Sequence, residues 1–249
     1  MDYSKHIILP DLHIPAHNKA LIAATLKYVY LNRDEINSIN FSGDTMDIRA
    51  INFYDEGNVV DINLGLEYNA GSEVLDLFDE AMNDQVETKR FLFGNHEDRL
   101  NRAMQQLEMS KYGSAIQDID TGLKLHERGY EIFPDWKEDE IILGDLTIIH
   151  GIYHNIHAAY NHALKLGKNI LFGHTHRVQY FNLGTSRFKG YNIGWMGDAN
   201  HRFMKYMSKA QREAWQNAFA IVTVVNGKHH VQIIEWKDNH FVVDGKVYQ

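Results

Sequence analysis

The sequence predicts an α/β protein in which short buried strands alternate with amphipathic helices. Apolar runs such as 91–93 and 170–172 have the composition of strands that are buried on both faces. Between such runs lie longer segments with apolar residues at helical spacing, as in 64–82. Several runs end directly before polar side chains, and open α/β sheets bind their ligands at the carboxyl ends of their strands.

The first 109 residues follow this alternation. The segment 17–31 carries a broad apolar face that includes Leu21, Ala24 and Tyr28, and 64–82 carries Leu75 and Phe78 at helical spacing. We expect strands at 6–10, 38–42 and 90–93, and helices at 17–31, 64–82 and 97–109.

The pattern is weaker between 110 and 139, where Ile116, Ile119, Leu123 and Leu125 suggest a helix and 133–136 a loop. Gly144-Asp145 between two apolar runs is a hairpin signal. Beyond it we expect strands at 140–143, 146–149, 169–172, 220–225, 231–236, 241–243 and 246–248, and a helix at 156–166. Because no linker or repeat interrupts the chain, we expect one domain over residues 1–249.

Composition excludes several classes of protein. The chain has no cysteine, so disulfides and thiolate metal sites are excluded. A net charge of −8 with scattered Lys and Arg argues against a face dedicated to duplex DNA. The start of the chain lacks a signal peptide pattern and no apolar run is long enough to span a membrane. We therefore expect a cytoplasmic protein, in the host cytoplasm if a phage encodes it, with no membrane partner.

Fifteen histidines are an unusual number, and several of them follow strands. Five predicted strands end in metal-binding side chains: Asp11 and His13; Asp44; Asn95 and His96; His150; His174 and His176. In an extended segment, residues two apart point the same way, which applies to the first and last pairs. Carboxylate, imidazole and amide ligands without sulfur suit Mn²⁺, Fe, Zn²⁺ or Co²⁺. Only two of these ligands are formally negative, so two divalent ions would leave a positive site that attracts phosphate.

The motifs Asp11-x-His13, Gly43-Asp44-x-x-Asp47, Gly94-Asn95-His96-Glu97, His150-Gly151 and Gly173-His174-Thr175-His176 resemble the five ordered motifs of the calcineurin-like metallophosphoesterases. Residues 94–102, 194–198 and 215–219 further resemble the small phage and prophage members. The resemblance implies a four-layer α/β/β/α sandwich of two mixed sheets. In that fold, the β-rich tail from Ala220 onward would complete the second sheet.

The resemblance also implies a role for each motif residue. Asp11, His13 and His176 would hold one metal ion, Asn95, His150 and His174 the other, and Asp44 would bridge both. His96 would donate a proton to the leaving group, with Asp47 holding its other ring nitrogen. We expect two Mn²⁺ ions, with Fe, Zn²⁺, Co²⁺ or Ni²⁺ as alternatives. The residues expected to contact substrate are Asn95, Arg99 and His157.

The expected function is metal-dependent hydrolysis of a phosphomonoester, with nucleoside monophosphates as substrates, as in a 5′-nucleotidase. A phosphodiesterase or DNA nuclease with the same metals is the main alternative, so single-stranded nucleic acid is a second candidate partner. A third possible function is that of a protein-binding scaffold without catalysis. No feature of the sequence indicates an oligomeric state.

Other residues near the motifs have ordinary structural explanations. Glu97 and Asp98 are expected in the first turn of a helix, where acidic residues interact well with the helix dipole. Trp195 and Trp215 are expected to pack in the core or a lid rather than to stack on bases.

Overall fold

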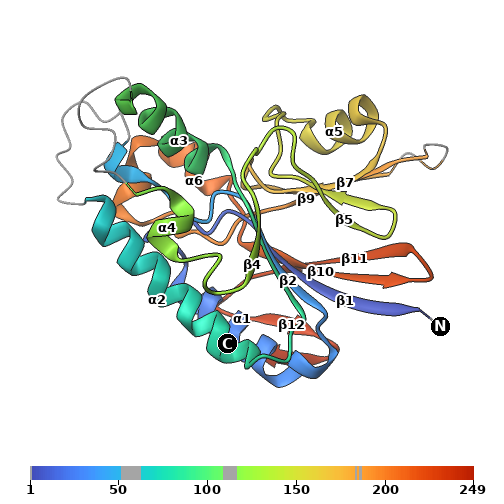
Figure 1. Ribbon diagram of the computed structural model, residues 1–249. Coiled ribbons are helices and arrows are strands. Elements are labelled where there is room, and N and C mark those ends of the chain that lie inside the picture. Colours follow the sequence, from blue (N-terminus) through green and yellow to red (C-terminus); the bar gives the residue numbers. More distant parts are fainter. Residues whose placement is uncertain (1, 52–62, 109–116, 183, 185–186) are drawn as a thin grey trace.

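The computed structural model describes residues 2–51, 63–108, 117–182, 184 and 187–249, and its strands form two large mixed sheets (Figure 1). The first sheet contains, in order, β11 (Lys228–Glu235), β10 (Ala218–Val225), β1 (Tyr3–Leu9), β2 (Ser38–Ser42), β3 (Thr88–Leu92) and β4 (Tyr130–Phe133). The second contains β5 (Ile141–Leu143), β6 (Leu146–Ile148), β7 (Asn169–Phe172), β9 (Lys189–Ile193) and β8 (Val178–Asn182). A separate ladder pairs β12 (Phe241–Val243) with β13 (Lys246–Tyr248).

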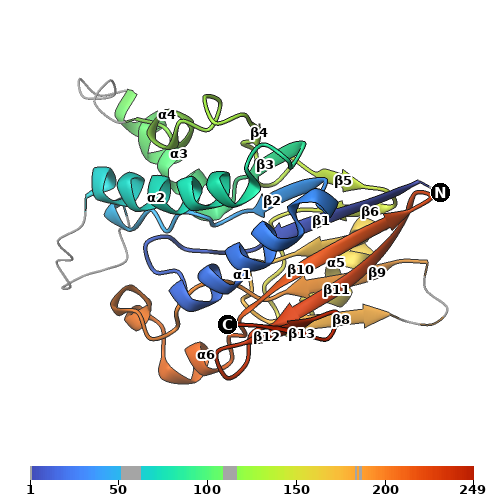
Figure 2. The ribbon, with the colours of Figure 1, turned by 90° about the horizontal axis from the view of Figure 1, so that it is seen from below.

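The two sheets lie between helices in four layers. On the outer face of the first sheet, α1 (Lys19–Asn32) and α2 (Leu64–Met82) pack around Phe41, which lies in one buried cluster with Tyr28 and Phe78 (Figure 2). Between the sheets, Ile8 and Leu92 share a second cluster with side chains of β5, β6, β7, β9 and β10. On the outer face of the second sheet, α5 (Ala158–Leu166) packs on Ile170 and Phe172. These layers confirm the predicted α/β/β/α sandwich.

Side-chain caps and turns fix the ends of the main elements. The side chain of Asn18 accepts the Leu21 amide and so begins α1, and Gly167 at φ 64° ends α5. Asn226 and Gly227 both have positive φ, as a tight turn between β10 and β11 requires. Where the chain is described, no helix is both long and apolar enough to cross a bilayer.

The prediction for the tail from Ala220 was wrong in one respect. The strands β10 and β11 belong to the first sheet, not the second, because β10 pairs antiparallel with β1 from Tyr3↔Val225 to Ile8↔Ala220. In the first sheet, β10 therefore pairs with β1 on the side away from β2, and β11 pairs with β10. The second sheet is completed by β8 and β9, which have no apolar run that would have identified them.

The segment around residue 130 also differs from the sequence interpretation. Residues 130–133 form β4, parallel to β3, although we expected a loop from Phe133. The predicted helix there is only α4 (Ile119–Leu123), and Ile116 lies outside the described residues. The remaining helices are α3 (Asn95–Glu108), α6 (Lys209–Glu213) and the 3-10 turns η1 (Arg33–Glu35), η2 (Arg49–Ile51) and η4 (Arg202–Tyr206). The predicted end of α3 at Met109 also lies outside the described part.

The strand directions bring the polar ends together. Strands β1, β2, β3 and β4 run parallel, and so do β6, β7 and β9. Parallel strands end at the same edge of a sheet. The five strands that precede polar motifs therefore present their carboxyl ends at one edge of each sheet.

Candidate metal centre

The backbone turns sharply at the strand ends that carry the motifs. Asp11, His13, Asp44, His174 and His176 all have φ between 46° and 62°, the left-handed region that costs a residue with a side chain about 1–2 kcal/mol. We expected the pairs two residues apart to be extended, and that expectation was wrong. Such strain collects where function needs it, and here it marks the edge at which these side chains meet.

One group of ligand atoms combines Asp11, His13 and His176. Their ligand atoms lie within 4.8 Å of one another, and all three residues are buried. The Nε2 atoms of His13 and His176 are 3.0 Å apart, and His176 Nε2 is 3.7 Å from Asp11 Oδ1. These are the three residues that the resemblance assigns to one metal ion.

A second group combines Asp44, His150 and His174. Oδ2 of Asp44 is 3.3 Å from Nε2 of His150, which in turn is 3.2 Å from Nδ1 of His174. Oδ1 of Asn95 lies 3.0 Å from the same His150 nitrogen. Asp44 Oδ2 is also 3.9 Å from Nε2 of His13, so the Asp44 carboxylate lies between the two groups.

The donor set suits divalent cations. It consists of imidazole nitrogens and carboxylate and amide oxygens, which suit Mn²⁺, Fe or Zn²⁺. The Nε2 atoms of His13 and His176 are 3.0 Å apart, and the Asp11 carboxylate lies beside them. His13 donates its Nδ1 proton to Asp47, so its Nε2 carries a lone pair that can bind a cation.

His96 and Asp47 form the next part of the site. Nδ1 of His96 lies 2.8 Å from the Asp47 carbonyl and 3.1 Å from its Oδ1. Nε2 of His96 lies 3.8 Å from Asp44 Oδ2, and His96 lines the cavity. With His13 and Asp44 it also forms a third group of ligand atoms within 4.8 Å of one another. Burial would lower the pKa of His96, but the negative charge of Asp44 and the hydrogen bond to Asp47 raise it. A raised pKa favours the protonated ring that a proton donor needs.

The charges of this site depend strongly on one another. Burial lowers the pKa of His150, but the Asp44 carboxylate outweighs it and raises that pKa to about 9. Burial, together with the positive charge of His150, lowers the pKa of His174 to about 3. Burial raises the pKa of Asp11 to about 7. A cation binding here would displace protons, so its affinity should rise with pH.

Glu97 has a structural task that the sequence did not reveal. Its buried carboxylate accepts the backbone amides of Asp44 at 3.0 Å, Met46 at 2.8 Å and Gly94 at 2.7 Å. It therefore joins the loop after β2 to the loop after β3. A Cβ atom at Gly94 would lie 2.2 Å from Asp44 Oδ1, so only glycine allows this approach. An acidic residue three positions after that glycine is the one sequence signal for this contact.

The two sheets are joined at the site by Asp11. The backbone amide of His174, after β7, donates to Oδ1 at 3.0 Å and Oδ2 at 2.9 Å of Asp11, after β1. A Cβ at Gly173 would lie 1.7 Å from Asp11 Oδ2, which explains the glycine before His174. This contact holds ligands from opposite sheets in one place.

Two tryptophans pack against the candidate ligand His176. The Trp195 ring stacks on His176 with centroids 4.6 Å apart and planes 12° apart, and Trp215 meets His176 edge-on at 4.7 Å. Above the ligands lies a cavity of about 310 Å³, to which Trp215, Tyr206, Met207, Gln211, His154 and Arg177 contribute walls. Trp195 is buried beneath it.

Two of the residues predicted to contact substrate lie elsewhere. His157 is exposed at the start of α5 and is not among the residues that line the cavity, whereas His154, three residues earlier, is. Arg99 donates to the Asp47 carbonyl at 3.4 Å and also does not line the cavity. Asn95, the third, does line it. Which side chains line a cavity depends on contacts between segments far apart in the chain, so sequence spacing could not place these two residues.

No protein-family model matches the chain, and no curated protein matches it in sequence. Among solved structures, the chain is similar to a single mutant of Vps29 from Entamoeba histolytica, with a TM-score of 0.47 and 15% sequence identity. That match covers 98% of this chain and 95% of the Vps29 chain.

Proposed function

We propose that the protein is a metallophosphoesterase, which hydrolyses phosphoric esters at a pair of divalent cations. One observation carries the proposal: Asp11, His13 and His176 form one group of ligand atoms within 4.8 Å of one another, and Asp44, His150 and His174 form another. These residues follow four strands of the two sheets, and Asp44 Oδ2 is also 3.9 Å from His13 Nε2 of the first group. The order and spacing of the motifs, which resemble those of calcineurin-like enzymes and their small phage members, support it.

Each residue of the site then has a task. Asp11, His13 and His176 would hold one cation, Asn95, His150 and His174 the other, and Asp44 both. When bound, such cations polarise the phosphoryl group and supply a nucleophile from water at neutral pH. Their charge also attracts a phosphate in a protein whose net charge is −8.

His96 acts on the leaving group. Nδ1 of the ring faces Asp47, and Nε2, directed towards the cavity, donates its proton to the departing oxygen. An alkoxide is a poor leaving group, so this proton should accelerate its departure by about 10²–10⁴-fold. Asp47 keeps the ring oriented and supports its positive charge.

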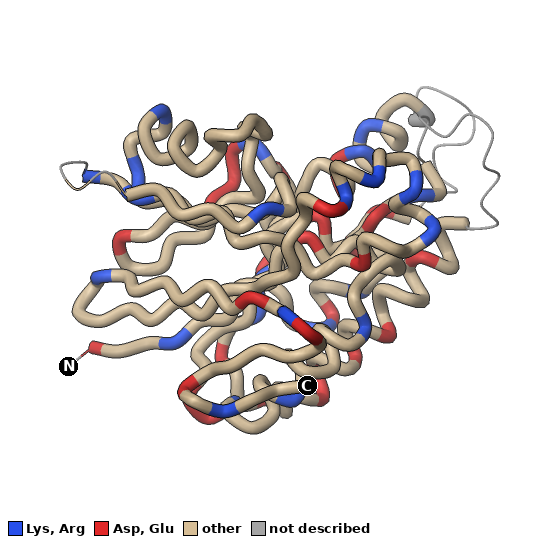
Figure 3. Tube along the Cα trace, turned by 180° about the vertical axis from the view of Figure 1, so that it is seen from behind, with Lys and Arg blue, Asp and Glu red and all other residues tan. Residues whose placement is uncertain are grey.

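We propose nucleoside monophosphates as the substrate class and Mn²⁺ as the metal. A cavity of about 310 Å³ has the size of a small-molecule site. Figure 3 shows Lys and Arg interspersed with Asp and Glu along the chain, a distribution that suits a small substrate better than duplex DNA. The cysteine-free composition suits the reducing cytoplasm, where we propose that the enzyme acts.

A phosphodiesterase or single-strand nuclease is the second candidate, because the segment that lines the cavity above the ligands also lines a basic cavity through Asp198 to Phe203. A scaffold without catalysis is less well supported, since it would not need a complete ligand set together with His96.

The test compares substrates on protein loaded with Mn²⁺. Nucleoside monophosphates, a bis-aryl phosphodiester and single-stranded DNA are assayed in parallel, with the Asp44→Asn variant as the control for contaminating phosphatases. We expect turnover of the monophosphates that the variant lacks. Turnover of the diester or DNA alone would replace the monoesterase by the second candidate. A wild-type protein that binds no divalent metal by elemental analysis would overturn the proposal as a whole.

A further inference from the structure

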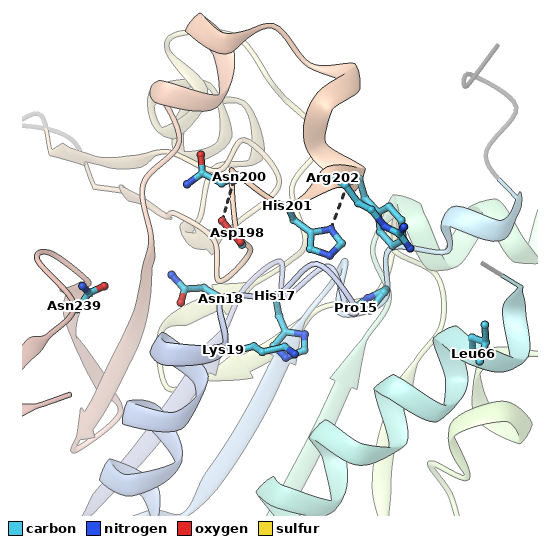
Figure 4. Close-up of a pocket in the computed structure, with 11 residues that line it drawn as sticks. Pro15, His17, Asn18, Lys19, Leu66, Asp198, Asn200, His201, Arg202 and Asn239 are labelled. Carbon is cyan, nitrogen blue, oxygen red and sulfur yellow. Dashed lines mark hydrogen bonds between the residues drawn. The ribbon is translucent and has the colours of Figure 1, made fainter. Parts of the chain in front are cut away.

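We propose that a cavity of about 700 Å³ at the start of α1 is a second binding site, specific for phosphate groups and independent of the metal centre. The cavity lies between the first residues of α1, the start of α2 and the loop before η4 (Figure 4). Its polar walls come from His17, Asn18, Lys19, Asp198, Asn200, His201, Arg202 and Asn239.

The cavity is basic in an acidic protein. Lys19 and Arg202 carry full positive charges, two imidazoles add hydrogen-bond donors, and the lining contains one acid, Asp198. The Asp198 carboxylate already accepts the amide of Asn200 at 2.8 Å. A local excess of positive charge, opposite in sign to the net charge of −8, concentrates anions at this place.

Lys19 stands where it lowers the stability of its own helix. The first turn of α1 contains no acidic residue, and Lys19 is its first residue. The positive end of the helix dipole lies there, so a cation at this position destabilises the helix. An anion bound in the cavity reverses the sign, because it interacts favourably with both Lys19 and the dipole.

The backbone at this point also offers donors. Asn18 accepts the amide of Leu21 through its side chain and that of Ile22 through its carbonyl. The amides of Lys19 and Ala20 stand first in the helix, where the helix itself provides no acceptor. The side chains that line the cavity give the site its charge.

His17 contributes an atom without a partner. Its Nδ1 is buried and has no hydrogen-bond partner among the described residues. In Figure 4 the His17 ring lies beside Lys19 and below His201. Burial, then the charges of Lys19 and His201, lower the pKa of His17 to about 4, so the ring is neutral near pH 7. The positive charges of the lining are therefore those of Lys19 and Arg202, and the neutral His17 ring adds a hydrogen-bonding atom without a partner.

This cavity and the one above the candidate metal ligands are lined by successive parts of one segment. Asp198 to Phe203 line the basic cavity, whereas Tyr206 to Trp215 of the same segment line the cavity above the metal ligands. His17 also pairs with Gly197 in an isolated bridge, four residues after His13. A bound phosphate could belong to a small free compound or to a strand that extends from the metal centre.

The test measures binding rather than catalysis, so that its outcome is separate from that of the proposed function. Pyrophosphate and tetrathymidylate are titrated calorimetrically into the full chain, desalted from chelator, in low salt. Lys19→Ala and Arg202→Ala are compared with Lys27→Ala and Lys205→Ala. These controls remove one exposed charge each from α1 and η4, away from the cavity lining. Circular dichroism checks that every protein remains folded.

We expect saturable binding of pyrophosphate at one site, weakened about tenfold by Lys19→Ala and by Arg202→Ala and less than twofold by the controls. Tighter binding of tetrathymidylate with the same dependence would assign the phosphate to a strand, and equal or weaker binding to a small compound. No saturable binding of either probe, or an equal loss in the control variants, would overturn the proposal.

Discussion

The imidazole of His13 donates a hydrogen bond of 3.0 Å from Nδ1 to Oδ1 of Asp47. Nδ1 of His96 lies 3.1 Å from that same oxygen, and the two rings meet edge-on with centroids 4.6 Å apart. One carboxylate thus orients both a candidate metal ligand and the candidate proton donor. Substitutions of Asp47, His96 and Asp44 should distinguish metal binding from proton donation.

Replacing Asp47 by Asn should weaken metal binding and turnover together. The amide keeps the shape of the side chain but loses the charge that orients both rings, and such partners of metal ligands contribute about 10–100-fold to affinity or activity. Titration with Mn²⁺ and the initial rate measure the two effects. Asp98→Asn, a partly exposed acid paired with Arg102 at 3.0 Å, is the matched control. Unchanged metal affinity would show that Asp47 does not act through His13.

Replacing His96 by Ala should leave the metal content unchanged and lower turnover according to the leaving group. With an alkyl phosphate the loss should be about 10²–10⁴-fold, because the departing alkoxide needs a proton. An activated aryl phosphate leaves without one and should lose less than about tenfold. Equal losses on both substrates would contradict proton donation, and a loss of metal would make His96 a ligand.

Replacing Asp44 by Asn should empty or disorder both metal positions. The Oδ2 atom is 3.3 Å from His150 Nε2 and 3.9 Å from His13 Nε2, so it serves both groups. Elemental analysis and anomalous scattering would count the ions. If one ion stays at full occupancy, the carboxylate does not bridge.

Replacing Glu97 by Gln should lower the free energy of unfolding by about 1–3 kcal/mol. The carboxamide would direct an N–H₂ group at backbone amides that the carboxylate accepts, and buried donors without acceptors are costly. Urea denaturation measures the change. Asp98→Asn, one residue later on the same helix, loses a partly exposed ion pair and should change stability by less than about 1 kcal/mol. Equal effects of the two substitutions would show that the buried contacts of Glu97 do not determine its contribution.

Stability should fall on acidification because of His162. Its Nε2 accepts the amides of Ile152 and Tyr153 and its Nδ1 donates to the Ala158 carbonyl, so the folded protein needs the neutral ring. Burial lowers its pKa from 6.5 to about 4. Between these two values the unfolded chain binds more protons, so stability is present above pH 6.5 and is lost as the pH falls towards 4.

From pH 7 to pH 5 this loss should reach about 2 kcal/mol, measured by urea denaturation. His162→Gln keeps an acceptor without a titrating proton, so its stability should depend less on pH than that of the wild type by that amount. His157→Gln, exposed at the start of the same helix, should leave the dependence unchanged. Parallel curves for wild type and His162→Gln would rule out this source.

Local patterns in the sequence predicted the α/β alternation and the candidate ligands. Apolar runs such as 170–172 identify strands because burial on both faces requires them. One Asp or Asn after such a run is an ordinary turn or cap residue, and only the recurrence of Asp, Asn or His after five runs pointed to a shared site. The four-layer sandwich also followed, from the resemblance of the ordered motifs. What a local pattern can encode is whether a residue is buried and where a strand ends.

The tertiary structure alone decided which surfaces meet. The pairing of β10 with β1, the clamp of Glu97 on three amides and the place of His154 in the cavity in preference to His157 depend on residues far apart in the chain. The same holds for Asp47, whose one oxygen contacts two histidines, 34 and 49 residues away. Such contacts leave no periodicity in the sequence, because their energy comes from long-range packing and hydrogen bonds rather than from local propensity.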